Sequence, residues 1–344
     1  MRLGVAAALV DRQLVPGDVE VVEGRVAGIG VPAPGGQGIA APGFVDLQVN
    51  GFAGIDFLEA DAGGYRRAGE ALLETGVTAF LPTFVTAPEE RLVAALREVP
   101  ASTGGPRVLG VHLEGPFLSP HRLGVHPAEH RRDPDTELLD RLLSAGPVRL
   151  VTLAPELPGA HALVRNLLDC GVAVSYGHSD ATAEEAHAAF ELGPKTVTHL
   201  FNAMRPFHHR DPGLAGAALA RDDVVVQVIL DGVHLAPETA ALAWRAARGR
   251  LALVTDSTAV PGGRTPEGVL AGGTATMIEA ARSLHALGAS LGESIDAATA
   301  VPARLLGLRE AGRLGVGLPA DLVVLSQELE VERVLVDGVD RLGS

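Results

Sequence analysis

Three residues that commonly bind divalent metal ions stand at the ends of three short apolar segments of this 344-residue chain. Glu114 lies in GVHLEGPF, His178 in SYGHSDAT and His199 in VTHLFNAM. A lone histidine in a strand is more often an ordinary core residue, and His112, two residues before Glu114, is expected to be one. Two imidazoles and one carboxylate from three strands, however, match the three protein ligands of a catalytic zinc site, which keeps a fourth position for water. We therefore predict that Glu114, His178 and His199 bind one divalent metal ion.

A further acidic residue, Asp256 in ALVTDSTA, ends another apolar segment. A carboxylate beside a metal-bound water can take its proton and then pass it to a leaving amine. Asp-Ser-Thr is also a common capping sequence at the start of a helix or turn. Given the expected metal ligands, we favour the catalytic role for Asp256.

Gln48 and Asn50, in VDLQVNG, stand where many metal-dependent hydrolases have His-x-His. Neutral amides are poor metal ligands beside imidazole, although each offers an acceptor and two donors. The only lysine, Lys195, begins the sixth apolar segment and lies on the wrong face to bridge two metals. We predict a single metal ion, with both amides hydrogen-bonded to water or substrate where a second ion is absent. The alternative is a barrel that has lost catalysis and only binds its ligand.

These residues belong to a series of eight strand candidates that alternate with amphipathic helical segments. The candidates end near Asn50, Thr83, Gly115, Glu156, His178, Asn202, His234 and Ser257. Eight such units predict a closed (β/α)8 TIM barrel, an α/β fold in which polar residues at the C-terminal strand ends share one mouth. An open doubly wound sheet also collects polar groups at strand ends and is the alternative. Thr182 and Glu185 have the spacing of a capping box at the start of one helix.

The two flanks differ from the centre because they contain short strand and turn patterns without helices. Residues 1–42 and 313–344 are each too short to be stable alone. We expect them to form one small β-sandwich beside a barrel of residues 43–312.

Composition excludes several classes of protein. A net charge of −14 argues against nucleic acid or anionic membrane as a partner, so an anionic ligand would need a local cationic pocket. The single cysteine, Cys170, cannot form an internal disulfide and is expected to be buried. The N-terminal MRLGVAAALV is expected to be a first strand rather than a signal peptide, and no apolar run approaches the ~20 residues of a membrane span. We expect a cytoplasmic protein.

The chain resembles the N-acetylglucosamine-6-phosphate deacetylase family of the amidohydrolase superfamily. The resemblance runs through nearly the whole chain and rests on long, distinctive segments: APGFVDLQVNGFAG, LGVHLEGPFLSPHRLGVHP, VSYGHSDAT, THLFNAMRPFHHRDPGLAGAAL, DGVHL, LVTDSTA and GGTATMIEAARSL. Members of this family are barrels with a small β-sandwich built from both termini, usually homodimers. The resemblance implies that the chain removes acetate from N-acetylglucosamine 6-phosphate and leaves glucosamine 6-phosphate.

Residue roles carry over along these segments. The resemblance implies the metal ligands named above, with Zn as the first choice of ion and Fe, Co or Mn accepted by the same ligands. It makes Asp256 the general base and acid, and His126 a group that helps to polarise the acetamide carbonyl. Implied substrate contacts are Val125, Asn202, Ala203, Arg210, Asp231, His234, Leu270, Ala271 and Gly272.

Arg210 lies in RPFHHRDPG, the densest basic cluster of an acidic chain. Such a cluster suits a phosphate dianion, and arginine is its best bidentate partner. The resemblance allows Arg210 to act across a dimer interface. The alternative is a solvated loop paired with Asp211.

Three questions stay open from the sequence. The same site could act on another N-acetyl amino sugar phosphate, such as a galactosamine derivative, or on another amide. The chain could also be a non-catalytic barrel that binds a sugar phosphate. The segment between Asp256 and Leu270 is shorter than the insertion that family members often carry, and less cover over the sugar would loosen specificity.

Overall fold

The computed structural model describes residues 1–265 and 268–342, and the short segment before Leu270 therefore includes two residues outside the described ones. Its centre is a barrel of eight parallel strands. They are β6 (Phe44–Val49), β9 (Val77–Val85), β11 (Val111–Glu114), β12 (Val148–Leu153), β13 (Ala173–Tyr176), β14 (Thr196–Val197), β15 (Val225–Val228) and β16 (Leu251–Leu253). A short extra strand, β10 (Arg107–Val108), pairs with the first half of β9. A bridge between Val49 and Ser257 joins the last strand to the first, so the predicted barrel is confirmed and the open sheet is excluded.

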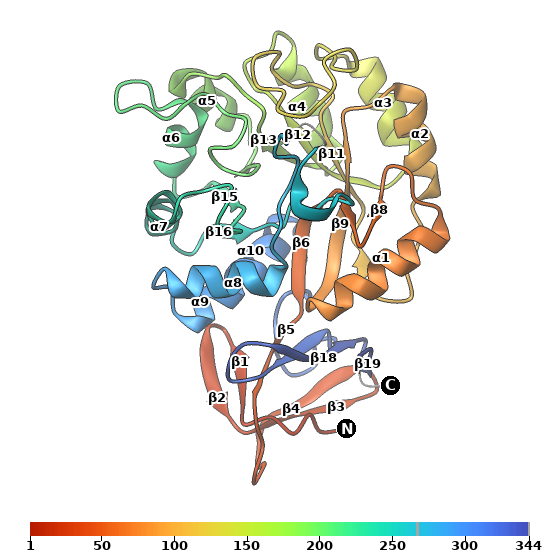
Figure 1. The fold of residues 1–344 in the computed structure, drawn as a ribbon, viewed down its shortest axis with the longest axis vertical. Coiled ribbons are helices and arrows are strands. Elements are labelled where there is room, and N and C mark those ends of the chain that lie inside the picture. The colour runs from red at the N-terminus through yellow and green to blue at the C-terminus, as the bar shows by residue number, and fades with distance from the viewer. Residues whose placement is uncertain (266–267, 343–344) are drawn as a thin grey trace.

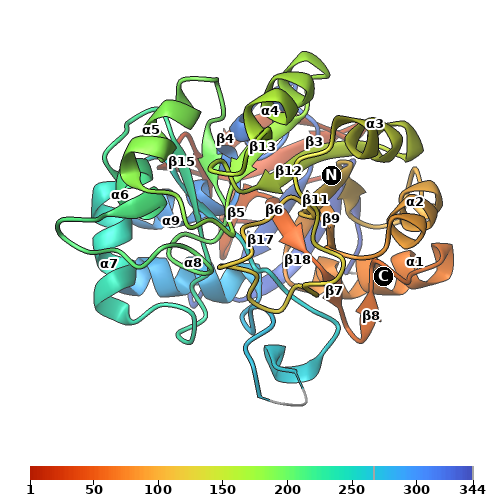
Figure 2. The same cartoon turned by 90° about the horizontal axis from the view of Figure 1, so that it is seen from above.

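A ring of helices surrounds these strands (Figure 2). One helix follows each strand: α1 (Ala62–Glu74), α2 (Glu89–Glu98), α3 (Thr136–Ala145), α4 (Ala160–Asp169), α5 (Ala183–Phe190), α6 (Gly213–Leu219), α7 (Pro237–Ala246) and α8 (Met277–Ala286). Helices α9 (Leu291–Ala298) and α10 (Ala300–Leu305) come next. The capping box at Thr182 and Glu185 is confirmed at the start of α5. Helix α3 shows why the ring forms, because it buries Leu138, Leu139 and Leu142, which lie on one face at helical spacing.

Below the barrel lies a six-stranded sheet built from both ends of the chain (Figure 1). In spatial order it contains β19 (Val339–Asp340), β18 (Val331–Val336), β17 (Leu322–Leu325), β5 (Ile39–Pro42), β1 (Ala7–Val10) and β2 (Gln13–Pro16). A hairpin of β3 (Asp18–Val22) and β4 (Arg25–Val31) covers one face of it. Strand β17 is buried on both faces. Its side chains point alternately to the two faces, and each face packs against a different core. Leu322 and Val324 join the core shared with the hairpin, whereas Val323 and Leu325 join the main core.

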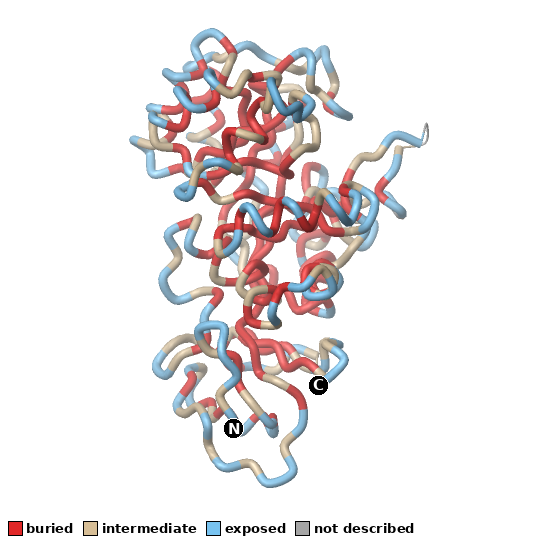
Figure 3. Tube along the Cα trace, turned by 90° about the vertical axis from the view of Figure 1, so that its left-hand side faces the viewer, coloured by how far each residue is buried: buried red, intermediate tan, exposed pale blue. Residues whose placement is uncertain are grey.

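Figure 3 shows the buried residues concentrated along the middle of both parts. The expected first strand is confirmed as β1, inside the N-terminal apolar segment. The expectation for Cys170 is wrong: it is exposed, because α4 ends at Asp169 and Cys170 is the capping residue beyond it. The domain boundaries at residues 42 and 313 stay a prediction. Within residues 1–265 and 268–342, no helix has both the length and the apolar character needed to cross a bilayer.

Candidate active site

Glu114, His178 and His199 converge at the C-terminal mouth of the barrel. The Oε1 atom of Glu114 lies 2.9 Å from Nε2 of His199 and 3.2 Å from Nε2 of His178. The two Nε2 atoms are 3.1 Å apart, and all three residues are buried. Among the described residues, these three form the one group of His, Cys, Asp or Glu side chains placed to hold a metal ion.

The hydrogen-bonding chemistry of this cluster fits a cation. The Nδ1 atom of His178 lies 2.9 Å from the carbonyl oxygen of Arg122, so a neutral ring that donates there has a lone pair on Nε2. That lone pair faces the carboxylate of Glu114, which has only acceptors when ionised. A divalent metal ion binds to lone pairs of nitrogen and oxygen that converge on one point, as they do here.

His112, two residues earlier on β11, stays outside the cluster. Its Nε2 lies 2.7 Å from the hydroxyl of Thr152, and its Nδ1 lies 3.4 Å from the hydroxyl of Thr83. Burial lowers the pKa of His112 to about 4, so this imidazole is neutral at physiological pH. His112 is therefore a buried core residue, as expected.

The backbone at the site adopts a conformation that most residues avoid. The φ angles of His178, His199 and Asp256 are 49°, 30° and 51°, in the left-handed region. Each of these residues lies two or three positions beyond the end of a barrel strand, where the chain turns toward the next helix. Such angles cost of order 1–3 kcal/mol each for non-glycine residues, and they concentrate at functional sites. Here they turn one imidazole or carboxylate toward the barrel axis at the end of each strand.

Asp256 lies in the same pocket with its carboxylate buried. Its Oδ1 accepts a hydrogen bond of 2.7 Å from Nδ2 of Asn50. Burial and the negative charge of Glu114 raise the pKa of Asp256 from 3.8 to about 8. Asp256 does not cap the next α-helix, since α8 begins at Met277 with Thr276 as its capping residue.

His126 reaches the cluster from the loop after β11. Its Nε2 is 3.7 Å from Oε2 of Glu114, and its ring meets that of His178 edge-on at 4.5 Å. The backbone N–H of Thr86 donates to Nδ1 of His126 over 3.3 Å, and the Thr86 hydroxyl lies 2.9 Å from the same atom. An accepted bond at Nδ1 places the ring proton on Nε2, which faces the pocket.

A cavity of about 240 Å³ surrounds these groups. The predicted site residues that line it are Asn50, Glu114, Val125, His126, His178, His199, Asn202, Ala203, His234, Asp256, Leu270, Ala271 and Gly272. Three others lie elsewhere: Gln48 sits beneath the cavity, Asp231 beside it, and Arg210 on the surface. The strand-end pattern therefore located most of the pocket, and the family segments supplied the rest.

Asp231 makes hydrogen bonds within the protein, and its expected contact with substrate stays a prediction. Its carboxylate accepts hydrogen bonds from the backbone of Val233 and His234, and from Nδ1 of His234 at 2.8 Å. Burial opposes the ionisation of Asp231, but these bonds hold its pKa well below its usual range. The structure thus places Asp231 as the residue that orients His234, and it is His234 that lines the cavity.

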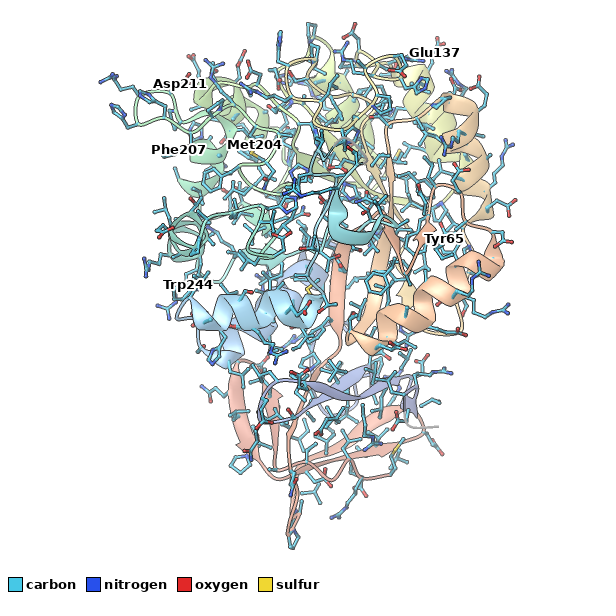
Figure 4. The ribbon with its side chains drawn as sticks, in the orientation of Figure 1. Tyr65, Glu137, Met204, Phe207, Asp211 and Trp244 are labelled. Atoms are coloured by element: carbon cyan, nitrogen blue, oxygen red, sulfur yellow. The ribbon has the colours of Figure 1, made fainter. Side chains whose placement is uncertain are left out.

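The segment between β14 and α6 projects from the side of the barrel, and Figure 4 shows Phe207 and Asp211 on it. Asp211 pairs with Arg205 at 2.7 Å, which agrees with the alternative of a solvated loop paired with Asp211. Arg210 is exposed near the tip, where the backbones of His208 and Asp211 bond to each other. Half of the Phe207 side chain is also exposed.

Several supporting residues escaped the sequence reasoning. Thr86, one residue beyond β9, orients His126 as described above. Glu156, beyond the end of β12, accepts hydrogen bonds from the Ser179 hydroxyl at 2.8 Å and from the Asp180 N–H at 2.7 Å, and so fixes the turn after His178. A polar residue at or just past a strand end is the signal that could have identified both.

Comparison with known proteins agrees with this geometry. The amidohydrolase family model matches residues 39–339. The human N-acetylglucosamine-6-phosphate deacetylase is 40% identical over 340 residues, which cover 88% of this chain and 83% of the human protein. The enzyme of that name from Bacillus subtilis is 36% identical over 331 residues, covering 87% and 84%.

Solved structures show the same likeness. The N-acetylglucosamine-6-phosphate deacetylase of Thermotoga maritima superposes with a TM-score of 0.92 at 31% identity, and the match covers 100% of both chains. A mutant of the Mycobacterium smegmatis enzyme, in complex with N-acetyl-D-glucosamine-6-phosphate, gives a TM-score of 0.91 at 35% identity over 98% of both chains. The chain therefore belongs to the amidohydrolase family and, within it, to the N-acetylglucosamine-6-phosphate deacetylases.

Proposed function

We propose that the protein hydrolyses the acetamide of N-acetylglucosamine 6-phosphate and releases acetate and glucosamine 6-phosphate. The observation that carries the proposal is the buried cluster of Glu114, His178 and His199, which shares one cavity with the carboxylate of Asp256. A ligand-binding barrel without catalysis would have no use for both groups in one pocket. The names of the relatives, and the sugar phosphate bound to the mutant enzyme of Mycobacterium smegmatis, support the choice of substrate.

Glu114, His178 and His199 would hold one divalent ion, with zinc as the first choice and iron, cobalt or manganese compatible with the same ligands. When bound, the ion supplies a Lewis acid that polarises the carbonyl and acidifies water. Gln48 and Asn50 would leave no second ion in this site, because neither amide is a good metal ligand.

Asp256 would move the proton. It takes a proton from the attacking water as the new C–O bond forms, and returns it to nitrogen as the C–N bond breaks. Its raised pKa suits both steps, because a carboxyl group whose pKa lies near neutral pH both accepts and releases a proton readily. His126 would donate its Nε2–H to the carbonyl oxygen as negative charge develops there.

The remaining cavity residues would bind the sugar phosphate. Asn202 and the backbone N–H of Ala203 would meet the phosphate, and Arg210 would add charge from the projecting segment of a second subunit. His234 and Val125 would contact the sugar, with the backbone of Leu270, Ala271 and Gly272 closing the pocket. The homodimer, the role of Arg210 and a cytoplasmic location are parts of this proposal.

The decisive experiment compares the wild type with Asp256→Asn in acetate release from N-acetylglucosamine 6-phosphate. Loss of the proton acceptor should lower kcat by about 100-fold or more. Equal rates would contradict the proposed mechanism. A panel of glucosamine and galactosamine derivatives, each with and without phosphate, would decide the sugar and the need for phosphate.

A further inference from the structure

Gln48 and Asn50 each bond to a different carboxylate of the site. Nε2 of Gln48 donates to Oε1 of Glu114 over 3.1 Å. Nδ2 of Asn50 donates to Oδ1 of Asp256 over 2.7 Å. Gln48 is fully buried, and Asn50 lines the cavity. Two residues from the same strand end thus reach the two acidic groups of the site.

The backbone of both amides is fixed to the neighbouring strand end. The N–H of Gln48 donates to Oδ1 of Asp46 over 3.2 Å, and its carbonyl accepts from the hydroxyl of Thr255 over 3.4 Å. The N–H of Asn50 donates to the carbonyl of Ser257 over 2.8 Å. A donor on an anchored backbone holds its acceptor in one orientation, because neither partner can turn without losing the bond.

The two bonds have different consequences. Oε1 of Glu114 is the atom nearest both imidazole Nε2 atoms, so the bond from Gln48 fixes the ligand oxygen. The bond from Asn50 occupies Oδ1 of Asp256, and no described residue donates to Oδ2. The base is therefore left with one free oxygen, Oδ2, for the proton.

We propose that Gln48 is a positioning residue for metal binding, acting through Glu114, and that Asn50 is a positioning residue for proton transfer, acting through Asp256. The proposal rests on the function proposed above. In this proposal the two amides are not only the remnant of a second metal site, because each orients one carboxylate of the site. The carbonyl oxygens of both amides are buried without a protein partner, which leaves them as acceptors for water in the site.

Matched apolar substitutions test the division of tasks. Gln48→Met should weaken zinc binding by about 10- to 100-fold, the usual cost of losing a residue that orients a metal ligand, measured by competition with a chromophoric chelator. At saturating zinc its kcat should stay within about 3-fold of the wild type. Asn50→Leu should bind zinc within about 2-fold of the wild type, yet lose about 10- to 100-fold in kcat with little change in KM.

Gln227→Met is the matched control. Gln227 is equally buried, on β15, and donates 3.0 Å to the hydroxyl of Thr196, away from both carboxylates. It should change neither zinc affinity nor kcat, so effects of a buried amide on general stability are separated from effects on the site. If Gln48→Met or Asn50→Leu behaves like this control, the proposal is overturned.

Equal loss of zinc affinity and kcat in both variants would also overturn it, because the two amides would then act as one unit. Crystal structures of the variants add a readout that needs no substrate. The Glu114 carboxylate should change rotamer only in Gln48→Met, and that of Asp256 only in Asn50→Leu. A wild type that releases no acetate from the sugar phosphate would contradict the proposed function, and zinc affinity and rotamers would still decide these two roles.

Discussion

Asp46 offers a direct test of how the barrel closes. Strands β6 and β16 are joined by a single bridge, and the carboxylate of Asp46 spans the gap. It accepts bonds from the hydroxyl of Thr255 at 2.5 Å, from the Thr255 N–H at 3.3 Å and from the Gln48 N–H at 3.2 Å. Asp46 is fully buried, and burial raises its pKa from 3.8 to about 6 despite these three bonds.

This shift predicts a pH dependence of stability with a definite sign. An acid whose pKa is higher in the folded state binds its proton more tightly there, so folding is favoured while the group is protonated. Its contribution is greatest below pH 3.8 and is lost as pH rises to about 6. Each pKa unit is worth about 1.4 kcal/mol, so above about pH 6 the ionised carboxylate lowers the free energy of unfolding by about 3 kcal/mol.

The variant Asp46→Asn removes the ionisation. Relative to the wild type, its unfolding free energy should rise by about 2 kcal/mol between pH 4.5 and pH 7.5. Urea unfolding of metal-free protein, followed by the fluorescence of the single tryptophan, Trp244, measures this difference. Asp169 supplies a control. Its carboxylate is exposed, so Asp169→Asn removes the same charge from the surface rather than from the buried core. Parallel pH curves for the wild type and Asp46→Asn would refute the reasoning.

Three further predictions concern the site itself. Arg210→Ala should raise KM for the phosphorylated sugar by about 10- to 100-fold, the value of a charge-assisted hydrogen bond, and leave the unphosphorylated sugar unaffected in steady-state kinetics; an equal change for both would remove the phosphate role. Removing divalent metal with a chelator should abolish acetate release, and zinc should restore it; full activity in protein shown to be metal-free by elemental analysis would contradict the metal site. Thr86→Val should lower kcat about 10-fold at unchanged metal content, because Nδ1 of His126 loses its hydroxyl partner; unchanged kcat would mean that the Thr86 backbone alone orients the ring.

The barrel was predictable because apolar residues repeat with a different period in its strands and in its helices, and because polar residues stand at strand ends. Eight apolar segments gave eight strands, and the same ends brought Glu114, His178, His199 and Asp256 into one pocket. These predictions need only alternation along the chain and the common direction of parallel strands.

Other features depend on contacts that no periodicity records. The register between β6 and β9 shifts between Asp46 and Val49, and a bulge of this kind redirects side chains near it. Gln48 lies within this shift and donates to Glu114, whereas the sequence suggested a contact with water or substrate. Burial of Cys170 was expected from its apolar neighbours, but the exact end of a helix is decided by backbone capping.

The sheet beneath the barrel has a consequence for how the chain is made. Strand β17, near the C-terminus, lies between β5 and β18, so the outer edge of β5 stays unpaired until almost the whole barrel has left the ribosome. The apolar underside of the barrel, against which Val323 and Leu325 pack, is uncovered for the same time. An open strand edge beside an apolar surface invites aggregation. Until β17 pairs with β5, the growing chain therefore exposes an open strand edge and an apolar surface at the same time.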